Sequence, residues 1–558
     1  MNMRSFWWLA LGFTLLWIWM EWSQFSAQKS LEAQKMQAQT TEVPAAQSAP
    51  QSQTQADVPM AANSDQPAVQ SVPSTQPTAP SKQRIHVKTD VLAVEIDTYG
   101  GDIRKVDLLK YGASKDRNQP FQLMGDQGQM YYVAQNGIAK LPDAKLPAPT
   151  HKDVYQTQKV NYTLHGNTLT VPLVWEKAGV KVTKTYTFTQ GEYTVKLDYK
   201  VENNSDKPWS GSLYSQLVRN RYDPDHNRFM YTYTGPVIYN PLAEDKYVKH
   251  PFDDLDKQPV SVNTQGGWVA MIQHYFISAA IPHQDQKNML YTKALGEGKY
   301  AAGVVQPVVT IPPQQSADLK SELYLGPIIQ DKLGQVAPGL ERTVDYGVLT
   351  FIAEPIFWLL EKIHNVVGNW GWSIILLTIL IKLLFFKLSE ASYRSMAKMK
   401  KFSPKLKQLK ENYGDNKELF QKKMMELYKE EKINPLGGCL PILVQMPVFI
   451  ALYWVLLYSA EMRQAPWIGW IQDLSSPDPY YILPVIMGVT MYIQQKLNPS
   501  NMMDEMQQKV MRLLPFIFTI FFAFFPAGLV LYWVVNNMLS VAQQWYITRK
   551  IQQGEAAK

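Results

Sequence analysis

Hydrophobic positions follow two different periods in the two halves of the chain. From residue 83 to 345 apolar and polar residues alternate in short runs that turn residues separate. One run, VLAVEIDTYGGDIRKVDL, alternates on both sides of Gly100-Gly101, and a later region holds two such stretches, Val180–Thr189 and Tyr193–Val201. Alternation with period two is typical of strands with one buried face. The pattern predicts a large all-β sandwich, followed by a short helical region near residues 330–340.

The C-terminal half instead contains long apolar segments. They lie at residues 369–388, 439–459, 480–497, 511–525 and 527–547, and each approaches the ~20 residues that span a bilayer as a helix. Residues 346–366 come before them and place several apolar side chains on one helical face, with charged residues between. This segment is predicted to be an amphipathic helix at the membrane interface.

The N-terminus carries Arg4 and then an apolar run from Phe6 to Met20, without a good small-x-small cleavage site after it. An uncleaved signal anchor over residues 1–26 is favoured over a cleaved signal peptide. Residues 27–82 are dominated by Gln, Ala, Ser, Thr and Pro. Such a stretch cannot bury enough apolar surface to fold, so it is predicted to be a disordered linker.

Lysine and arginine positions predict the orientation of these six spans. The connection 389–435 contains twelve basic and seven acidic residues, whereas the connection 460–479 contains one basic residue, Arg463, and three acidic ones. By the positive-inside rule the first is cytoplasmic and the second external. Both chain ends, including the basic tail 549–558, are then cytoplasmic. The β-domain is external, in the periplasm of a cell that has two membranes.

The cytoplasmic connection 389–435 has its own helical pattern. Apolar residues recur at spacings of three and four on both sides of a Gly414-Asp415 turn, which predicts an amphipathic helical hairpin. Two readings remain open. The apolar stripes hold the two helices together while lysines touch lipid headgroups, or the methionine-rich hairpin contacts varied apolar clients. The residues expected at such a contact surface are Met396, Met399, Lys405, Lys407 and Met424.

Lys382 lies inside the first apolar segment, SIILLTILIKLLFFKL. Its side chain could extend to the membrane surface near Lys387, as lysines at helix ends do. None of the five C-terminal apolar segments contains Asp or Glu, so a buried Lys382 has no acidic partner there, which is costly in hydrocarbon. The remaining alternatives are a deprotonated amine or a site wet enough to solvate the charge.

Polar residues in the other segments favour the wet site. They are Thr378, Gln445, Gln494, Gln495, Asn536, Asn537, Ser540, Gln543 and Gln544, most of them toward the predicted cytoplasmic ends. Ordinary hydrogen bonds between helices would also account for such residues. Together with Lys382 they predict a hydrophilic cavity that opens to the cytoplasm and stops partway through the membrane.

Several chemistries lack their motifs. The single cysteine, Cys439, excludes an intramolecular disulfide and a cysteine metal cluster. The chain has no phosphate-binding Gly-x4-Gly-Lys-Ser/Thr loop and no His-Glu-x-x-His motif, and seven of its eight histidines lie in the β-domain. The net charge of +7 is modest, so no particular nucleic-acid sequence is expected as a partner. We expect no enzyme activity, no cofactor and no metal.

Three long stretches carry a family resemblance. INPLGGCLPILVQMPVFIALYWVL (433–456), APWIGWIQDLSSPDPYYILPVIMGVTMYIQQKL (465–497) and FFPAGLVLYWVVNNMLSVAQQW (525–545) closely resemble the YidC membrane protein insertases of Gram-negative bacteria. So do the hairpin sequence and the order of anchor, linker, β-domain and membrane helices. The resemblance covers nearly the whole chain.

The resemblance implies a β-supersandwich periplasmic domain over 83–345 and an insertase core over 367–548, with five helices and a hydrophilic groove that faces the cytoplasm. Most members carry arginine where this chain has Lys382; lysine keeps the charge but lacks the fork geometry of a guanidinium. The groove residues expected here are Lys382, Thr378, Gln445, Gln495, Tyr532, Trp533 and Asn536.

The expected function is insertion and assisted folding of inner-membrane proteins, alone or beside the Sec translocon. The expected partners are nascent membrane proteins, the ribosome, the Sec translocon and the lipid bilayer. Two alternatives belong to other classes. A transporter of small solutes or ions also uses charge inside the membrane, although coupled proton transport usually needs a carboxylate or histidine there. A membrane anchor for a carbohydrate-binding β-domain is the other, and it rests on likeness of fold alone.

Overall fold

The structure is a computed structural model of the 558-residue chain. It describes Pro59 and residues 83–113, 116–223, 232–413, 416–430, 440–497 and 505–556. The expected signal anchor at 1–26 and nearly all of the expected linker at 27–82 lie outside these residues, as does Cys439.

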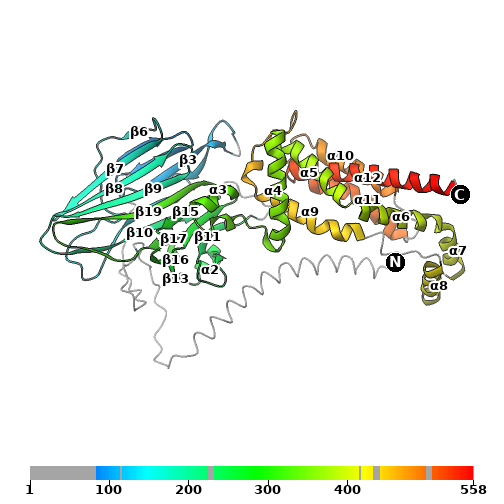
Figure 1. Ribbon diagram of the computed structural model, residues 1–558, viewed down its shortest axis with the longest axis horizontal. Coiled ribbons are helices and arrows are strands. Elements are labelled where there is room, and N and C mark those ends of the chain that lie inside the picture. Colours follow the sequence, from blue (N-terminus) through cyan, green and yellow to red (C-terminus); the bar gives the residue numbers. More distant parts are fainter. Residues whose placement is uncertain are drawn as a thin grey trace, which may run out of the picture. The chain divides into compact units, whose positions relative to one another are not determined.

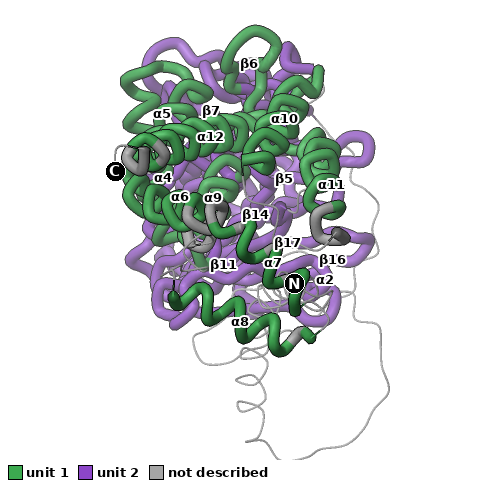
Figure 2. Tube along the Cα trace, turned by 90° about the vertical axis from the view of Figure 1, so that its right-hand side faces the viewer, with its two compact units in different colours: residues 1–51, 348–457, 465–558 green, residues 52–347, 458–464 purple. Residues whose placement is uncertain are grey.

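The chain forms two compact units, coloured separately in Figure 2. In the part of the chain that the structure describes, the first consists of helices from residues 348–457 and 465–556. The second contains the strands up to residue 347 and, in addition, residues 458–464 from the connection between two helices of the first unit. The strands run from blue to green in Figure 1 and the helices of the first unit from green to red.

The second unit is a sandwich of two large sheets. The eleven-stranded sheet has the order β13-β16-β17-β10-β5-β3-β2-β1-β6, with β18 paired to β10 and β4 paired to β3; the eight-stranded sheet has the order β12-β11-β14-β15-β19-β9-β8-β7. Apart from the parallel pair β1–β6, the pairs named in these orders are antiparallel. The predicted β-sandwich is thus confirmed.

The strands of the first sheet are β1 (Arg84–Lys88), β2 (Leu92–Asp97), β3 (Ile103–Gly112), β4 (Pro120–Met124), β5 (Tyr132–Lys140), β6 (Asn161–Thr163), β10 (Trp209–Asn220), β13 (Val260–Gln265), β16 (Lys287–Gly296), β17 (Lys299–Val305) and β18 (Val309–Ile311). Those of the second are β7 (Thr168–Lys177), β8 (Val180–Thr189), β9 (Thr194–Asn203), β11 (Thr234–Tyr239), β12 (Tyr247–Lys249), β14 (Trp268–Gln273), β15 (Phe276–Pro282) and β19 (Gln315–Pro327). Short helices α2 (Phe252–Leu255), α3 (Gln330–Val336), η1 (Leu340–Thr343) and η2 (Gly347–Leu349) accompany them.

Alternation in the sequence becomes alternation in burial. Along β8 every second side chain is buried, beginning with Val180, because successive strand residues face opposite sides of a sheet. The register places Lys184 among the apolar residues that face inward. The two glycines between β2 and β3 both have positive φ, 79° for Gly100 and 59° for Gly101, which a residue with a side chain rarely adopts. The turn and the β8–β9 hairpin both confirm the sequence prediction.

The first unit is helical. Its helices are α4 (Thr350–Val367), α5 (Trp370–Leu384), α6 (Phe386–Lys401), α7 (Ser403–Tyr413), α8 (Lys417–Glu430), α9 (Leu440–Tyr458), α10 (Ile482–Leu497), α11 (Glu505–Phe522) and α12 (Ala527–Ala556), with the short η4 (Ala460–Met462). Helix α12 packs against α5, α6 and α10, and α4 packs against α5. The amphipathic helix expected at 346–366 is α4, which buries Phe357 and Leu360 while Phe351 and Trp358 are exposed.

The first predicted span, 369–388, is not one straight helix. It is divided at Phe385 between α5 and α6, which meet with a bend of 65°. The bend lies where the apolar sequence ends and charged residues begin: Glu390 pairs with Lys387 and Arg394 on α6, and such ion pairs favour an exposed helix. In the described part of the chain, no single helix combines the length and hydropathy of a membrane span, and α5 with α6 does so only as this bent pair.

The first helix predicted for the hairpin is also divided. A continuous helix was expected through Met396 and Tyr413, but the structure ends α6 at Lys401 and begins α7 at Ser403. Pro404 lies in the first turn of α7, and proline inside a helix removes a backbone hydrogen bond and clashes with the preceding turn. The second predicted helix is present as α8.

Candidate functional site

Lys382 is buried in the helical unit near the end of α5, with 6% of its surface exposed. Its ammonium donates a hydrogen bond to Ser540 Oγ on α12 at 2.8 Å and lies 3.5 Å from Gln445 Oε1 on α9. Three helices that are distant in the sequence therefore supply one cluster. The ammonium is bonded to side chains of two other helices and is buried, which disfavours the surface-reaching alternative.

The acceptors of Lys382 are themselves hydrogen-bonded. Gln445 Nε2 donates to Asn536 Oδ1 at 2.6 Å, and Ser540 Oγ donates to the Asn536 carbonyl one turn earlier on α12 at 2.8 Å. Gln543 Nε2 lies 3.5 Å from the backbone carbonyl of Lys382. Since Asn536 bonds both acceptors, it positions them together around the ammonium. We call Lys382, Gln445, Asn536 and Ser540 the lysine cluster.

The hydrogen-bond partners of the cluster are neutral. Among the described residues no carboxylate forms an ion pair with Lys382, and the amide and hydroxyl oxygens that it contacts carry only partial charge. A buried cation is costly unless it is paired or solvated. The arrangement holds the ammonium between a hydroxyl and an amide oxygen of two other helices.

Other residues expected in the groove lie outside the cluster. Thr378 is buried, but its hydroxyl donates to the carbonyl of Ile374 in its own helix at 2.6 Å. Gln495 on α10 donates to the Met511 carbonyl on α11. These two side chains therefore stabilise a helix and a helix pair. Thr378 lies one turn before Lys382 on α5, but among the described residues no hydrogen bond joins Thr378 or Gln495 to the Lys382 ammonium.

Tyr532 and Trp533 on α12 surround an aromatic ring on α9. The ring of Phe449 stacks on Tyr532 with centroids 6.0 Å apart and meets Trp533 edge to face at 4.6 Å. Tyr532 is buried and Trp533 half-buried. Offset and edge-to-face contacts of this kind add about 0.5–1.5 kcal/mol beyond area burial. The two residues thus join α9 to α12 beside Asn536.

The hairpin residues are described in part. Met396 is half-buried on α6, and Met424 on α8 packs against the buried pair Leu406 and Tyr428. Lys405 is exposed, with its ammonium 5.2 Å from the ring of Phe402. The side chains of Met399 and Lys407 lie outside the described residues. An apolar contact between α7 and α8 is therefore present, as the amphipathic pattern predicted.

Ser540 has the shortest contact with Lys382, yet it was only one of several polar residues noted in the sequence. Asn536 and Ser540 have i, i+4 spacing, which places them on one face of α12. This spacing is the sequence feature that could have indicated Ser540 as a partner of Lys382. Tyr393 on α6 also reaches this turn, since its hydroxyl lies 3.4 Å from the Ser540 carbonyl. Asn537 instead faces α10, 3.5 Å from Thr490 Oγ1.

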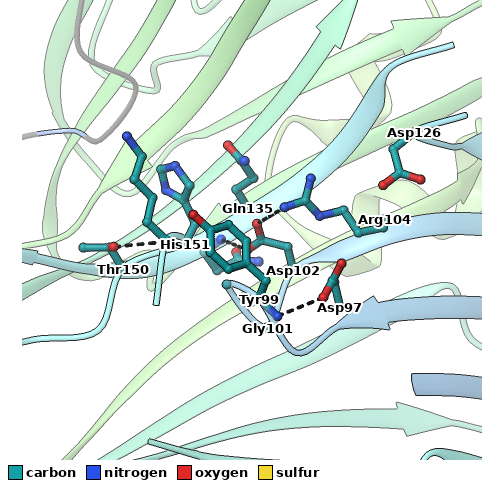
Figure 3. Close-up of polar contacts among 12 residues, drawn as sticks. Asp97, Tyr99, Gly101, Asp102, Arg104, Asp126, Gln135, Thr150 and His151 are labelled. Carbon is teal, nitrogen blue, oxygen red and sulfur yellow. Dashed lines mark hydrogen bonds and ion pairs between the residues drawn. The ribbon is translucent and has the colours of Figure 1, made fainter. Parts of the chain in front are cut away.

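A second buried polar cluster lies between the sheets of the β-unit, close to the residues in Figure 3. Lys184 on β8 donates to the carbonyls of Gly100 and Asn136 at 3.1 and 3.4 Å. Asp102 accepts from Arg104 at 3.3 Å, a contact that Figure 3 marks. Burial lowers the pKa of Lys184 to about 7, against the opposing effect of Asp102. Burial likewise raises the pKa of Asp102.

This cluster connects the two sheets of the sandwich. Tyr186 on β8 donates to the Gly101 carbonyl at 2.7 Å, and the ammonium of Lys184 lies 5.2–5.6 Å from the rings of Tyr155, Tyr186 and Tyr199. Hydrogen bonds and aromatic faces thus surround a charge that is removed from water. We assign the cluster to the stability of the β-unit. Across the described ranges, no group of three or more His, Cys, Asp or Glu residues is arranged to hold a metal ion.

Comparison with known proteins covers both units. Residues 84–359 match the family described as YidC periplasmic domain, and residues 362–554 match the family described as 60Kd inner membrane protein. A protein of Thioalkalivibrio sulfidiphilus described as membrane protein insertase YidC is 48% identical over 562 residues, which cover 99% of each chain. A protein of Stutzerimonas stutzeri with the same description is 48% identical over 545 residues and 96% of each chain.

Among solved structures, one described as an active YidC insertase with its first transmembrane domain resolved overlays with a TM-score of 0.39 and 16% identity. The overlay covers 84% of this chain and 93% of the other.

Proposed function

Because the chain belongs to the YidC family of membrane protein insertases, we propose that the lysine cluster is the point at which it receives the polar flank of a client protein. The chain is an inner-membrane insertase with a periplasmic domain, and membrane proteins are its substrates. The observation that carries the proposal is that the Lys382 ammonium is buried and bonded to neutral oxygens. Such a cation attracts the carboxylates of a short segment that enters the cluster.

The proposed mechanism has three steps. A nascent apolar segment first contacts the hairpin 389–435, where Met396, Met424 and Lys405 belong to the surface, together with Met399 and Lys407. Its polar flank, often acidic, then enters a hydrophilic groove that includes Lys382, Gln445 and Asn536. Finally the apolar segment leaves sideways into lipid while the flank is translocated.

Two driving forces support these steps without a chemical reaction. Transfer of apolar side chains into lipid is favourable in proportion to their area, and the membrane potential acts on the charge of the flank by about 2.3 kcal/mol per elementary charge per 100 mV. A groove shortens the path over which polar groups cross hydrocarbon. On this account insertion uses neither ATP nor a metal.

The proposed topology follows the distribution of basic residues. Six spans cross the membrane: the signal anchor 1–26 and five core spans at about 369–388, 439–459, 480–497, 511–525 and 527–547. The linker 27–82 and the β-domain 83–345 are periplasmic. Helix 346–366 lies at the membrane interface. The core 367–548 follows it, and the tail 549–558 comes after the core. Both termini are cytoplasmic. The hairpin then faces the ribosome, and the core works alone or beside the Sec translocon.

Photocrosslinking from Trp533 tests this proposal. A benzophenone amino acid at position 533 replaces a half-buried aromatic residue next to the lysine cluster, and we expect it to crosslink ribosome-bound nascent chains of a membrane protein. The matched control is position 470, a tryptophan of the external connection whose indole donates to Asp478. Nascent chains that crosslink as strongly from position 470 as from 533 would contradict the proposal.

A further inference from the structure

Residues 458–464 belong to the β-unit although the sequence places them between α9 and α10. Four of the seven are buried, with exposures of 1–8%: Ser459, Ala460, Met462 and Arg463. A loop that only joined two helices could remain in solvent. The assignment of these residues to the β-unit therefore requires a structural explanation, and we call residues 458–464 the anchor segment.

The anchor segment binds the backbone at the end of β3 through one amide side chain. Gln464 Oε1 accepts from the Gly112 amide at 3.0 Å, and Gln464 Nε2 donates to the carbonyls of Gly112 and Ala113 at 3.0 and 3.3 Å. One primary amide thus satisfies both backbone groups of Gly112, as a neighbouring strand does. Gln464 holds this position with a φ of 58°, a conformation uncommon for residues other than glycine.

Gly112 makes this approach possible. A Cβ atom at position 112 would lie 2.9 Å from Gln464 Oε1 and 2.5 Å from the Arg117 carbonyl oxygen, closer than packed atoms allow. The pairing of β3 with β4 also shifts register between Leu108 and Gly112. The strand is therefore open at this point to a partner that is not a strand.

Arg463 occupies an aromatic site beside Gly112. Its guanidinium donates to the Gly112 carbonyl at 2.7 Å and lies 5.1 and 5.3 Å from the ring centroids of Phe121 and Phe276. These two rings stack on each other at 4.1 Å, and both are buried. Cation–π contacts strengthen when the cation is desolvated, as Arg463 is at 8% exposure. The one basic residue of the external connection is thus held by the β-unit.

From these contacts we infer that the anchor segment is an integral part of the β-unit, which recognises Arg463 and Gln464 at the end of β3. The recognition elements are the Gly112 backbone and the stacked pair Phe121 and Phe276, and the partner that they fit is an Arg-Gln dipeptide of the same chain. The rest of the connection, from residue 465, belongs to the helical unit. This gives the external domain a structural task that does not depend on the proposed groove.

Hydrogen exchange of the full-length protein in detergent tests the inference. In Gln464→Ala the Gly112 amide loses its acceptor, so overlapping peptides that differ by Gly112 should show exchange of this amide about fivefold faster or more, the factor expected for one lost hydrogen bond. Arg463→Ala should accelerate the same amide, because the carbonyl of Gly112 loses a donor and the aromatic pair loses its cation. Arg463→Lys should have a smaller effect, still more than about twofold, since lysine keeps the charge but not the planar contact.

Gln472→Ala is the matched control. Gln472 is an exposed glutamine of the same connection whose side chain donates to the Gly469 carbonyl at 2.6 Å, and its loss should leave Gly112 unchanged. Peptides from β8 report whether a variant unfolds the whole β-unit. If amide exchange in these peptides is also faster in the alanine variants, the test rests on Gly112 exchange in the milder variant Arg463→Lys. Exchange of Gly112 within twofold of wild type in Gln464→Ala, or in Arg463→Lys where that variant decides, would overturn the inference.

Discussion

The ammonium of Lys382 on α5 lies 2.8 Å from the hydroxyl oxygen of Ser540 on α12. The Ser540 hydroxyl donates its own hydrogen bond to the carbonyl of Asn536 at 2.8 Å, so its oxygen lone pairs can accept from the lysine. A neutral acceptor fixes the position of a cation without cancelling its charge. A carboxylate at the same place would neutralise it, and would thereby remove the attraction that we propose for an acidic client segment.

Replacement of Ser540 by alanine should impair insertion of clients with acidic flanks. The variant removes the closest acceptor of the ammonium and leaves Gln445, at 3.5 Å. A hydrogen bond to a charged group contributes about 1.5–3 kcal/mol, so we expect insertion to slow by about tenfold if that bond positions the charge. Translocation of the flank in cells, followed by protease accessibility, measures the effect.

Thr519→Ala is the control for this experiment. Thr519 on α11 also donates its hydroxyl to a carbonyl of its own helix, that of Pro515, at 2.7 Å, but no hydrogen bond joins it to the lysine cluster. It should insert the same client at the wild-type rate. Equal defects in Ser540→Ala and Thr519→Ala would show that a helix hydroxyl, and not the contact with Lys382, is what matters.

The hairpin should depend on its shape more than on its surface charge. Met424→Pro places proline inside α8 and against Leu406 and Tyr428, at a cost of about 3 kcal/mol or more to the helix. We expect a strong insertion defect. Lys405→Glu reverses an exposed charge and should weaken contact with the ribosome or lipid only modestly. Insertion assays in cells depleted of the wild-type protein compare the two, and mild defects of equal size would contradict this account of the hairpin.

The stability of the β-unit should rise with pH because of Lys184. Its pKa in the folded state is about 7, lowered from 10.5 by burial. Between these values the unfolded chain binds a proton that the folded chain does not, so the free energy of unfolding increases with pH, approaching about 1.4 kcal/mol per unit. Below pH 7 both states are protonated and the contribution is flat. Pulse proteolysis in urea from pH 6 to 9 measures the change.

Lys184→Met should flatten this dependence, since methionine has no proton to bind. Lys181→Met is the control: Lys181 lies on the same strand, is partly exposed and pairs with Glu202 at 3.5 Å, so the wild-type slope should remain. A slope that persists in Lys184→Met would assign the pH dependence to another group.

Local patterns predicted most elements of the fold. The positive-φ turn at Gly100-Gly101, the β8–β9 hairpin and the amphipathic α4 each follow from neighbouring residues, which act within a few positions of one another. Pro404 is likewise a local sequence feature that accounts for the break in the first hairpin helix. The bend at Phe385 has no such marker, because no proline or glycine lies at that point.

Long-range contacts were beyond this kind of reasoning. The sequence indicated Lys382 as a functional residue because it is a cation among apolar residues. Which polar residue of α12 binds its ammonium depends on how three helices pack, and the sequence did not predict that this residue is Ser540. Arg463 and Gln464 resemble ordinary loop residues, and their partners Gly112, Phe121 and Phe276 lie more than 180 positions away in the sequence. Burial of such residues is decided by the tertiary fold and has no periodic signal.

The central claim is that Lys382 acts through its charge, and protease protection of one client with an acidic or a neutral translocated flank tests it most directly. Lys382→Arg should insert both versions, because the charge remains. Lys382→Ala should fail selectively with the acidic flank, and Lys382→Glu should be worse still, since repulsion replaces attraction. The account would be contradicted if Lys382→Ala inserted the acidic and neutral versions equally well, at the wild-type level.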